Sequence, residues 1–345
     1  MVSALRRVVK PLAYGLAAAV APALLHLPRG PRLLVLTYHR VLPEGHPARA
    51  YEEPAMVLSP ARLALHLQLL SQHMPFMHVE DWLDRRDGGA TLPRLACAVT
   101  FDDGWADNHD HAFPVLQQWQ VPATIYLATA RIGGTVGFWP TRLSRLLCSA
   151  WERGEGDLLV SLATQLPAVA WPTQVAAPQR RGVLHQLIDG LKQHYIDAQI
   201  DDALQAAVGR EGLAEVPDLL DWQQVQRMAD SGLVRFGSHT RNHRRLRADL
   251  PAAVLQDEVQ GSAQDIRQHL GRAPAGFCYP NGDLCAAARA CVTAHYRYAA
   301  LNDLGINARA TDPHSLLRVS FHDASGADVQ RVLGRIAGAC LGVGA

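Results

Sequence analysis

Lysine is almost missing from this chain, which contains only Lys10 and Lys192 among 345 residues. Nearly all of the positive charge is therefore arginine, and we interpret this bias as base composition rather than function. The formal net charge is +1 and the arginines are scattered, so the chain carries no excess of positive charge that would attract a polyanion. We therefore expect no nucleic-acid partner.

Cysteine is sparse as well, and its spacing is not that of a zinc finger. The six cysteines include no CxxC pair, which excludes the common zinc-finger patterns. Several lie inside apolar runs, as buried free thiols do, so the sequence does not support a disulfide scaffold. Repeats and low-complexity tracts are also absent. A hydrophobic content of 48% with 19% charged residues is typical of a globular protein with a sizeable core.

Long hydrophobic runs are lacking, and the nearest candidate lies at the N-terminus. Residues 1–31 combine a basic start, MVSALRRVVK, with a short apolar stretch that Pro22 interrupts. A membrane-spanning helix needs about 20 apolar residues, so this stretch is short for one. It fits a signal peptide, a helix that attaches peripherally to a membrane, or a plain cytoplasmic helix. The first two together favour the cell envelope, exported or membrane-associated, over the cytoplasm.

From residue 32 onward, apolar strand-like runs alternate with helical patterns. The predicted strands are RLLVLTYHRV (32–41), MPFMHV (74–79), ACAVTF (96–101), PATIYLAT (122–129), LVRFGSH (233–239), AGFCY (275–279), YRYAAL (296–301) and SLLRVSF (315–321). This alternation predicts an irregular α/β barrel of seven or eight strands, a deformed TIM-like (β/α) barrel, over residues 32–345. Residues from about 131 to 220 hold only helical segments. They predict a helical insertion that would serve as a lid or a substrate wall.

Polar residues follow several of the predicted strands, and in such barrels the chemistry lies at the carboxyl ends of the strands. His39 ends the first strand, and Asp102 and Asp103 end the strand ACAVTF. His239 ends LVRFGSH, with His243 four residues further on. Because parallel strands point the same way, these groups are expected to meet on one rim of the barrel.

A metal site would explain why two carboxylates stand side by side at a strand end, since buried like charges need a cation beside them. The spacing of His239 and His243 places both imidazoles on one face of a helical turn, where they can share one metal. Imidazole and carboxylate ligands suit Zn²⁺, with Ni²⁺ or Co²⁺ as alternatives. One aspartate would then be the third ligand, and the other would take a proton from a water that the metal has acidified.

The motifs TFDDG, SHTRNH and FCYPNG, in this order, resemble those of the polysaccharide deacetylase family (carbohydrate esterase family 4, the NodB homology domain). The resemblance covers residues 33–130 and 221–320, and LLVLTYHRV is similar to the branch that includes biofilm poly-N-acetylglucosamine deacetylases. It implies a divalent metal and a polysaccharide substrate. By position it implies Asp102 as the general base and a metal held by Asp103, His239 and His243.

The same resemblance suggests how substrate is bound. In the family, the loop at YPNG lines the groove wall, so Tyr279 is expected to contact the substrate. A backbone N–H near Asn281 is expected to stabilise the oxyanion together with the metal. Trp105 directly follows the first motif. Its aromatic face would suit a sugar ring, and packing within the core or a loop is the open alternative.

Two features of the family are missing from this sequence. Many members carry an arginine just before the proline of the third motif, paired with the base, whereas residues 277–280 read FCYP. We expect Arg318, in SLLRVSF, to take this place from another strand. Many members also end with a Leu-x-His motif that supplies the general acid, and SLLRV has no histidine there. His39 is the better candidate for this acid, or else a structural hydrogen-bonding partner.

These residues favour a metal-dependent hydrolase that removes N-acetyl groups from a polysaccharide or glycan containing N-acetylhexosamine. Activated water would attack the acetamide carbonyl. Two alternatives stay open: an O-acetyl esterase or small-substrate amidase on the same scaffold, and a non-catalytic carbohydrate-binding protein. Intact Asp102, Asp103, His239 and His243 argue against the second. The sequence does not indicate the oligomeric state.

Overall fold

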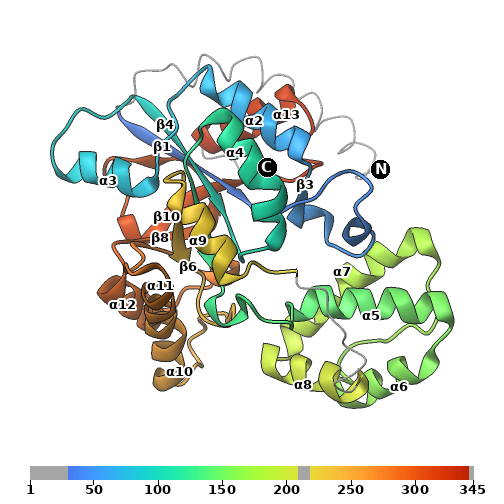
Figure 1. Ribbon diagram of the computed structural model, residues 1–345. Coiled ribbons are helices and arrows are strands. Elements are labelled where there is room, and N and C mark those ends of the chain that lie inside the picture. The colour runs from blue at the N-terminus through green and yellow to red at the C-terminus, as the bar shows by residue number, and fades with distance from the viewer. Residues whose placement is uncertain (1–29, 209–217, 342–345) are drawn as a thin grey trace. The chain divides into compact units, whose positions relative to one another are not determined.

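The computed structural model describes residues 30–208 and 218–341, and its larger unit is a closed barrel (Figure 1). Within these residues, seven parallel strands close into a ring because the last of them pairs back onto the first. In ring order they are β1 (Arg32–Tyr38), β4 (Leu95–Phe101), β5 (Ala123–Leu127), β6 (Val234–Ser238), β7 (Gly276–Cys278), β8 (Tyr298–Leu304) and β10 (Leu316–Ser320). The expected deformed (β/α) barrel is confirmed.

Helices flank the barrel strands, and short strands lie outside the ring. The barrel unit contains α2 (Pro60–Ser71), α3 (Val79–Asp87), α4 (Phe113–Trp119), α9 (Trp222–Asp230), α10 (Ala252–Gln256), α11 (Ser262–Leu270), α12 (Ala286–His295) and α13 (Val329–Leu341). β2 (Arg40–Val41) pairs with β3 (Val57–Leu58), and β9 (Asn307–Ala308) runs antiparallel to β1. Local signals set helix starts. Asp221 and Gln224 form a reciprocal capping box at the start of α9.

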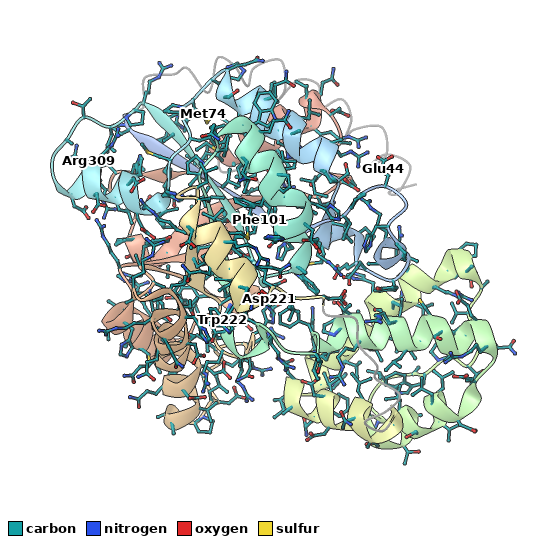
Figure 2. The ribbon with its side chains drawn as sticks, viewed as in Figure 1. Glu44, Met74, Phe101, Asp221, Trp222 and Arg309 are labelled. Carbon is teal, nitrogen blue, oxygen red and sulfur yellow. The ribbon has the colours of Figure 1, made fainter. Side chains whose placement is uncertain are left out.

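The continuous apolar runs of β1 and β4 reflect burial on both faces of the sheet. Every residue of both strands is buried. Leu34 and Leu36 pack with Leu67 of α2 and the other residues of one core cluster, whereas Leu33 and Val35 belong to a second cluster. Figure 2 shows side chains filling the space between strands and helices, with Phe101 among them. Alternate residues thus serve two cores, as a barrel covered by helices requires.

The segment MPFMHV (74–79) is not a strand, so this part of the strand prediction is wrong. Phe76 forms only one isolated bridge, to Cys97 of β4. The reason is non-local, because β5 pairs with the same edge of β4 from Val99 onward. Only Leu95–Ala98 remains free on that edge, and α3 begins at Val79, so the segment has little length in which to pair.

The second compact unit consists of residues 134–218 together with 45–54. It contains α5 (Trp139–Arg153), α6 (Gly156–Gln165), α7 (Ala177–His194) and α8 (Asp197–Val208). These helices bury their own apolar cluster, including Leu143, Leu162, Leu191 and Leu204. The sequence predicts helices over about 131–220 as an insertion within one barrel domain. The structure gives the helical stretch a core of its own.

The N-terminal prediction falls outside the described part of the chain, because the apolar and basic segment 1–31 overlaps it only at residues 30 and 31. Among the helices that the structure does describe, none has the length and apolar character needed to span a bilayer. The possible signal or anchoring function of the segment therefore stays a prediction.

His66, on α2, is buried and uses both ring nitrogens in its neutral form. Nε2–H donates to the carbonyl of Gly326 at 2.8 Å, and Nδ1 accepts from the hydroxyl of Tyr38 at 3.0 Å. Burial lowers the pKa of His66 from its ordinary 6.5 to about 4. The unfolded chain therefore binds a proton at His66 near pH 6.5, whereas the folded protein binds it only near pH 4. Well above pH 6.5 this difference in proton binding does not affect the free energy of unfolding. As the pH falls from 6.5 towards 4, it lowers the free energy of unfolding progressively.

We predict that mild acid destabilises the wild type more than a His66→Gln variant. Between about pH 7.5 and about pH 5, proton uptake by unfolded His66 should cost about 2 kcal/mol of unfolding free energy, which glutamine does not lose. Urea unfolding of both proteins at the two pH values measures the difference. Other histidines titrate equally in both proteins, so equal acid losses would contradict the prediction.

Candidate active site

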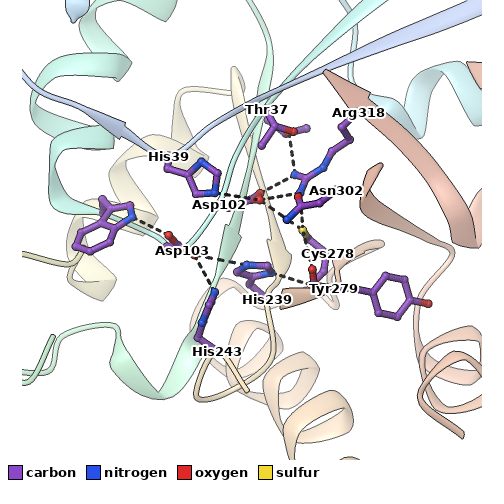
Figure 3. Close-up of polar contacts among 12 residues, drawn as sticks. Thr37, His39, Asp102, Asp103, His239, His243, Cys278, Tyr279, Asn302 and Arg318 are labelled. Carbon is purple, nitrogen blue, oxygen red and sulfur yellow. Dashed lines mark hydrogen bonds and ion pairs between the residues drawn. The ribbon is translucent and has the colours of Figure 1, made fainter. Parts of the chain in front are cut away.

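The polar residues predicted from the sequence meet at the carboxyl ends of the barrel strands (Figure 3). His39 follows β1, Asp102 and Asp103 follow β4, His239 follows β6, and Arg318 extends from β10. Strands from both ends of the chain thus bring their terminal side chains to one place. The expectation of a common rim agrees with this geometry.

Asp103 lies between the two histidines of the SHTRNH motif. Its Oδ1 is 3.5 Å from Nε2 of His239 and 3.4 Å from Nε2 of His243. This oxygen is buried and has no hydrogen-bond partner among the described residues. One ligand atom from each residue lies within 4.8 Å of the others. A buried, unsatisfied carboxylate oxygen facing two imidazole nitrogens is what a divalent cation would satisfy, so these residues fit a metal site.

His239 is held in the tautomer that a metal ligand requires. Its Nδ1 lies 2.7 Å from the carbonyl oxygen of Cys278, and because a carbonyl can only accept, Nδ1 carries the proton. Nε2 therefore presents its lone pair towards Asp103. Burial lowers the pKa of His239 to about 4, so the ring stays neutral near neutral pH. A carbonyl that orients a ligating imidazole in this way is a common support of metal sites.

The loop that carries His243 has a strained backbone. Thr240 and His243 both have left-handed conformations, with φ of 64° and 60°, which cost about 1 kcal/mol or more for residues other than glycine. Glu258, buried between α10 and α11, compensates. Its carboxylate accepts the backbone N–H groups of Arg241 at 3.0 Å and Asn242 at 2.9 Å, and the side-chain amide of Asn242 at 2.9 Å. Glu258 therefore fixes the loop that positions His243.

Asp102 is paired with Arg318 in a fully buried, bidentate arrangement. The two terminal nitrogens of the guanidinium donate to the two carboxylate oxygens, both at 2.8 Å. Burial opposes the ionisation of Asp102, but the charge of Arg318 outweighs it and holds the pKa of this carboxyl well below its usual range. Arg318 also donates to the carbonyl of Leu301 at 2.7 Å and to Asn302 Oδ1 at 2.6 Å. An arginine from β10 thus meets Asp102, although the third motif lacks one.

His39 faces Asp102 from the end of β1. Its Nε2 lies 3.8 Å from Asp102 Oδ2, and its side chain is 17% exposed. The amide of Asn108 donates to the carbonyl of His39 at 2.8 Å, which fixes the backbone there. His39 is therefore near the carboxylate and partly exposed, as a group that contacts a bound substrate has to be.

Two predicted substrate contacts are wrong. Tyr279 is completely buried, and its ring points away from Asp102 and His239 to pack edge-on against Phe277 at a centroid distance of 5.2 Å (Figure 3). The cause is the two-residue period of a strand. Cys278 faces the site, so its neighbours face the opposite side. Trp105 is only 2% exposed, too little for a sugar ring to stack on it.

Asn281 is exposed in the short helical turn Pro280–Gly282 that follows β7. Its backbone is left-handed, with φ of 56°. The loop that contains Asn281 therefore lies at the rim of the barrel, and its predicted contact with substrate stays a prediction.

The site also contains residues that the sequence did not single out. Cys278 Sγ lies 3.1 Å from Nη2 of Arg318 and 3.6 Å from Asp102 Oδ2. Asn302 and Glu258 hold Arg318 and the histidine loop, as described above. The position of Cys278 within FCYPNG, alternating with Tyr279, was a usable signal. Asn302 lies outside every motif and gave none.

The family model described as "Polysaccharide deacetylase" matches residues 90–156 and 163–299, which is more than half of the chain. The chain belongs to the polysaccharide deacetylase family. The predicted resemblance and the predicted enzyme class are thereby confirmed. Among curated proteins, none matches this chain.

Solved structures of deacetylases share the fold of this family member. The deacetylase PplD of Streptococcus pyogenes, in complex with acetate, is 16% identical, with a TM-score of 0.57 over 89% of this chain and 99% of that one. IcaB from Ammonifex degensii is 19% identical, with a TM-score of 0.57 over 88% and 98%. The BpsB deacetylase domain from Bordetella bronchiseptica is 17% identical, with a TM-score of 0.52 over 85% and 97%. At these identities the likeness concerns the fold.

Proposed function

We propose that this polysaccharide deacetylase is a metal-dependent hydrolase that removes N-acetyl groups from a glycan containing N-acetylhexosamine. The observation that carries the proposal is the pairing of two unequal aspartates. Asp103 directs an unsatisfied buried oxygen at His239 and His243, while its neighbour Asp102 is bound by Arg318. One carboxylate is thus free for a cation, and the other is kept ionised beside it.

Asp103, His239 and His243 would hold the cation, with Zn²⁺ preferred for two imidazoles and one carboxylate, and Ni²⁺ or Co²⁺ as alternatives. When bound, such a cation supplies positive charge that acidifies a water molecule and polarises a carbonyl oxygen. Two neutral imidazoles and one carboxylate leave a divalent site with net positive charge. That charge also favours the close approach of a second ionised carboxylate, Asp102.

The remaining chemistry falls to the residues of the chain. Asp102, kept ionised by Arg318, accepts a proton from the water that attacks the acetyl carbon. A backbone N–H of the loop at Asn281 donates to the oxyanion that forms on the acetyl oxygen. The C–N bond then breaks, and His39 donates a proton to the departing sugar nitrogen. The products are acetate and a free amine.

The charge around the site favours a neutral substrate. Four arginines of the stretch 241–247 each face a carboxylate: Arg241 faces Asp257 and Asp265, Arg244 faces Glu258, Arg245 faces Asp283, and Arg247 faces Asp249. Because each of these positive charges has an acidic neighbour, the loop next to His243 does not form an anion-binding patch. An uncharged N-acetylhexosamine glycan suits such a rim better than an acidic polymer.

Acetate release from chitooligosaccharides and poly-N-acetylglucosamine, measured together with metal content, tests the proposal. The wild type should release acetate, lose this activity after chelation, and regain it with Zn²⁺, Co²⁺ or Ni²⁺. His239→Ala should lose both metal and activity, whereas His295→Ala, at an exposed position on α12, should keep both. A metal-loaded wild type that is inactive on these glycans but cleaves O-acetyl esters would assign the esterase alternative instead.

A further inference from the structure

Trp105, which directly follows the DDG turn, is a buried hydrogen-bond donor to a proposed metal ligand. Its side chain is only 2% exposed, and Nε1–H donates to Oδ2 of Asp103 at 2.9 Å. Indole has one donor and no acceptor, so this bond is the polar function of the side chain.

The bond divides the two oxygens of Asp103 between two tasks. Oδ2 is satisfied by the indole, while Oδ1 is buried in front of the histidines and has no hydrogen-bond partner in the described part of the chain. The backbone at this point is unusual, because Asp103 has a left-handed φ of 77°. The orientation of the carboxylate about its terminal torsion is soft in general, so a donor on one oxygen decides which oxygen faces the histidines.

A buried ion pair packs over the face of the indole. The guanidinium of Arg40 lies 4.2 Å from the ring centroid of Trp105, and its Nε donates to Asp107 Oδ2 at 2.9 Å. Arg40 is 2% and Asp107 5% exposed. Asp107 is fixed in turn by the backbone N–H of Val41, which donates to Oδ1 at 2.6 Å. The contacts run without interruption from Asp107 through Arg40 and Trp105 to Asp103.

We propose that Trp105, supported by the Arg40–Asp107 pair, is a positioning residue that sets the affinity of the site for its divalent cation. This inference rests on the metal site in the proposed function. Without the N–H, Oδ2 is a second buried oxygen that lacks a partner, and the carboxylate is free to rotate or to split its charge between two orientations. The cation then meets a less organised ligand, as happens when partners of metal ligands are removed elsewhere.

Trp105→Phe removes the donor and keeps an aromatic ring beneath Arg40. We expect its Zn²⁺ affinity, measured by competition with a chromophoric chelator in the absence of any glycan, to fall about ten- to a hundredfold. The metal-free variant should stay folded by circular dichroism, and the rise in its melting temperature on adding Zn²⁺ should be smaller than in the wild type. The visible spectrum of the Co²⁺-loaded protein should also change.

Trp119→Phe is the matched control, because Nε1 of Trp119 has no hydrogen-bond partner within the residues that the structure describes. Its Zn²⁺ affinity should equal that of the wild type. Arg40→Lys keeps a charge for Asp107 but loses the planar group over the indole, and it should weaken Zn²⁺ binding less than Trp105→Phe does.

Unchanged Zn²⁺ affinity in Trp105→Phe would overturn the inference, and so would a metal-free variant that does not fold, because Trp105 would then be structural. A wild type that binds no divalent cation would instead defeat the metal-dependent function, which the same titration shows separately.

Discussion

An Asp102→Asn variant should bind its metal like the wild type and yet release acetate about a hundred- to ten-thousandfold more slowly. Asparagine keeps the shape of the side chain but cannot accept a proton from attacking water. The ligand set of Asp103, His239 and His243 is untouched. The loss should therefore appear in kcat, with the metal content per chain unchanged. Initial rates of acetate release and metal analysis of the same preparation measure both quantities.

Asp110→Asn is the matched control, because Asp110 is an exposed aspartate of the helical turn that follows the same motif. It should keep full activity. Arg318 retains two acceptors in Asp102→Asn, the carbonyl of Leu301 and Oδ1 of Asn302, so the variant is expected to fold. Full activity in Asp102→Asn would refute the assignment of the base. Loss of metal together with activity would place Asp102 among the ligands.

The barrel could be predicted from the sequence because its signal is local and repeated. Buried strands such as β1 and β4 are continuous apolar runs, and helices such as α9 begin at recognisable caps. The segment 74–79 has the same composition as a strand and still fails to become one. Whether it pairs depends on which edge of β4 is free, and that is decided by the register of β5. The sequence of the segment alone does not determine this pairing.

The site could be predicted only in part, for a similar reason. Asp103, His239 and His243 come from two short motifs whose residue types already suggest a metal. The partners that orient them come from elsewhere, as Glu258 does from a helix after the histidine loop. The place of Trp105 after the DDG turn marks it in the sequence, but only side-chain geometry shows that it is buried with its N–H pointing at Asp103. For Tyr279, the alternation along β7 was available and would have corrected the prediction.

Arg318→Met should lower the free energy of unfolding of the metal-free protein by about 3–5 kcal/mol. Methionine fills much of the same space but leaves Asp102 as a buried carboxylate without its cation. Asp102 is only 1% exposed, so water cannot replace the lost partner. Urea unfolding of the wild type and the variant, both stripped of metal, measures the loss as a lower midpoint at constant slope.

The double variant Asp102→Asn/Arg318→Met separates the charge of Asp102 from the packing of Arg318. If the stranded charge causes the loss, the double variant should be more stable than Arg318→Met alone, since neutral asparagine is cheaper to bury than an unpaired carboxylate. Arg331→Met, at a half-exposed position on α13, should change stability by less than about 0.5 kcal/mol. A double variant as unstable as the sum of the two single variants would mean that Arg318 stabilises the barrel through Leu301 and Asn302, and not through Asp102. The base would then have to be kept ionised by the metal alone.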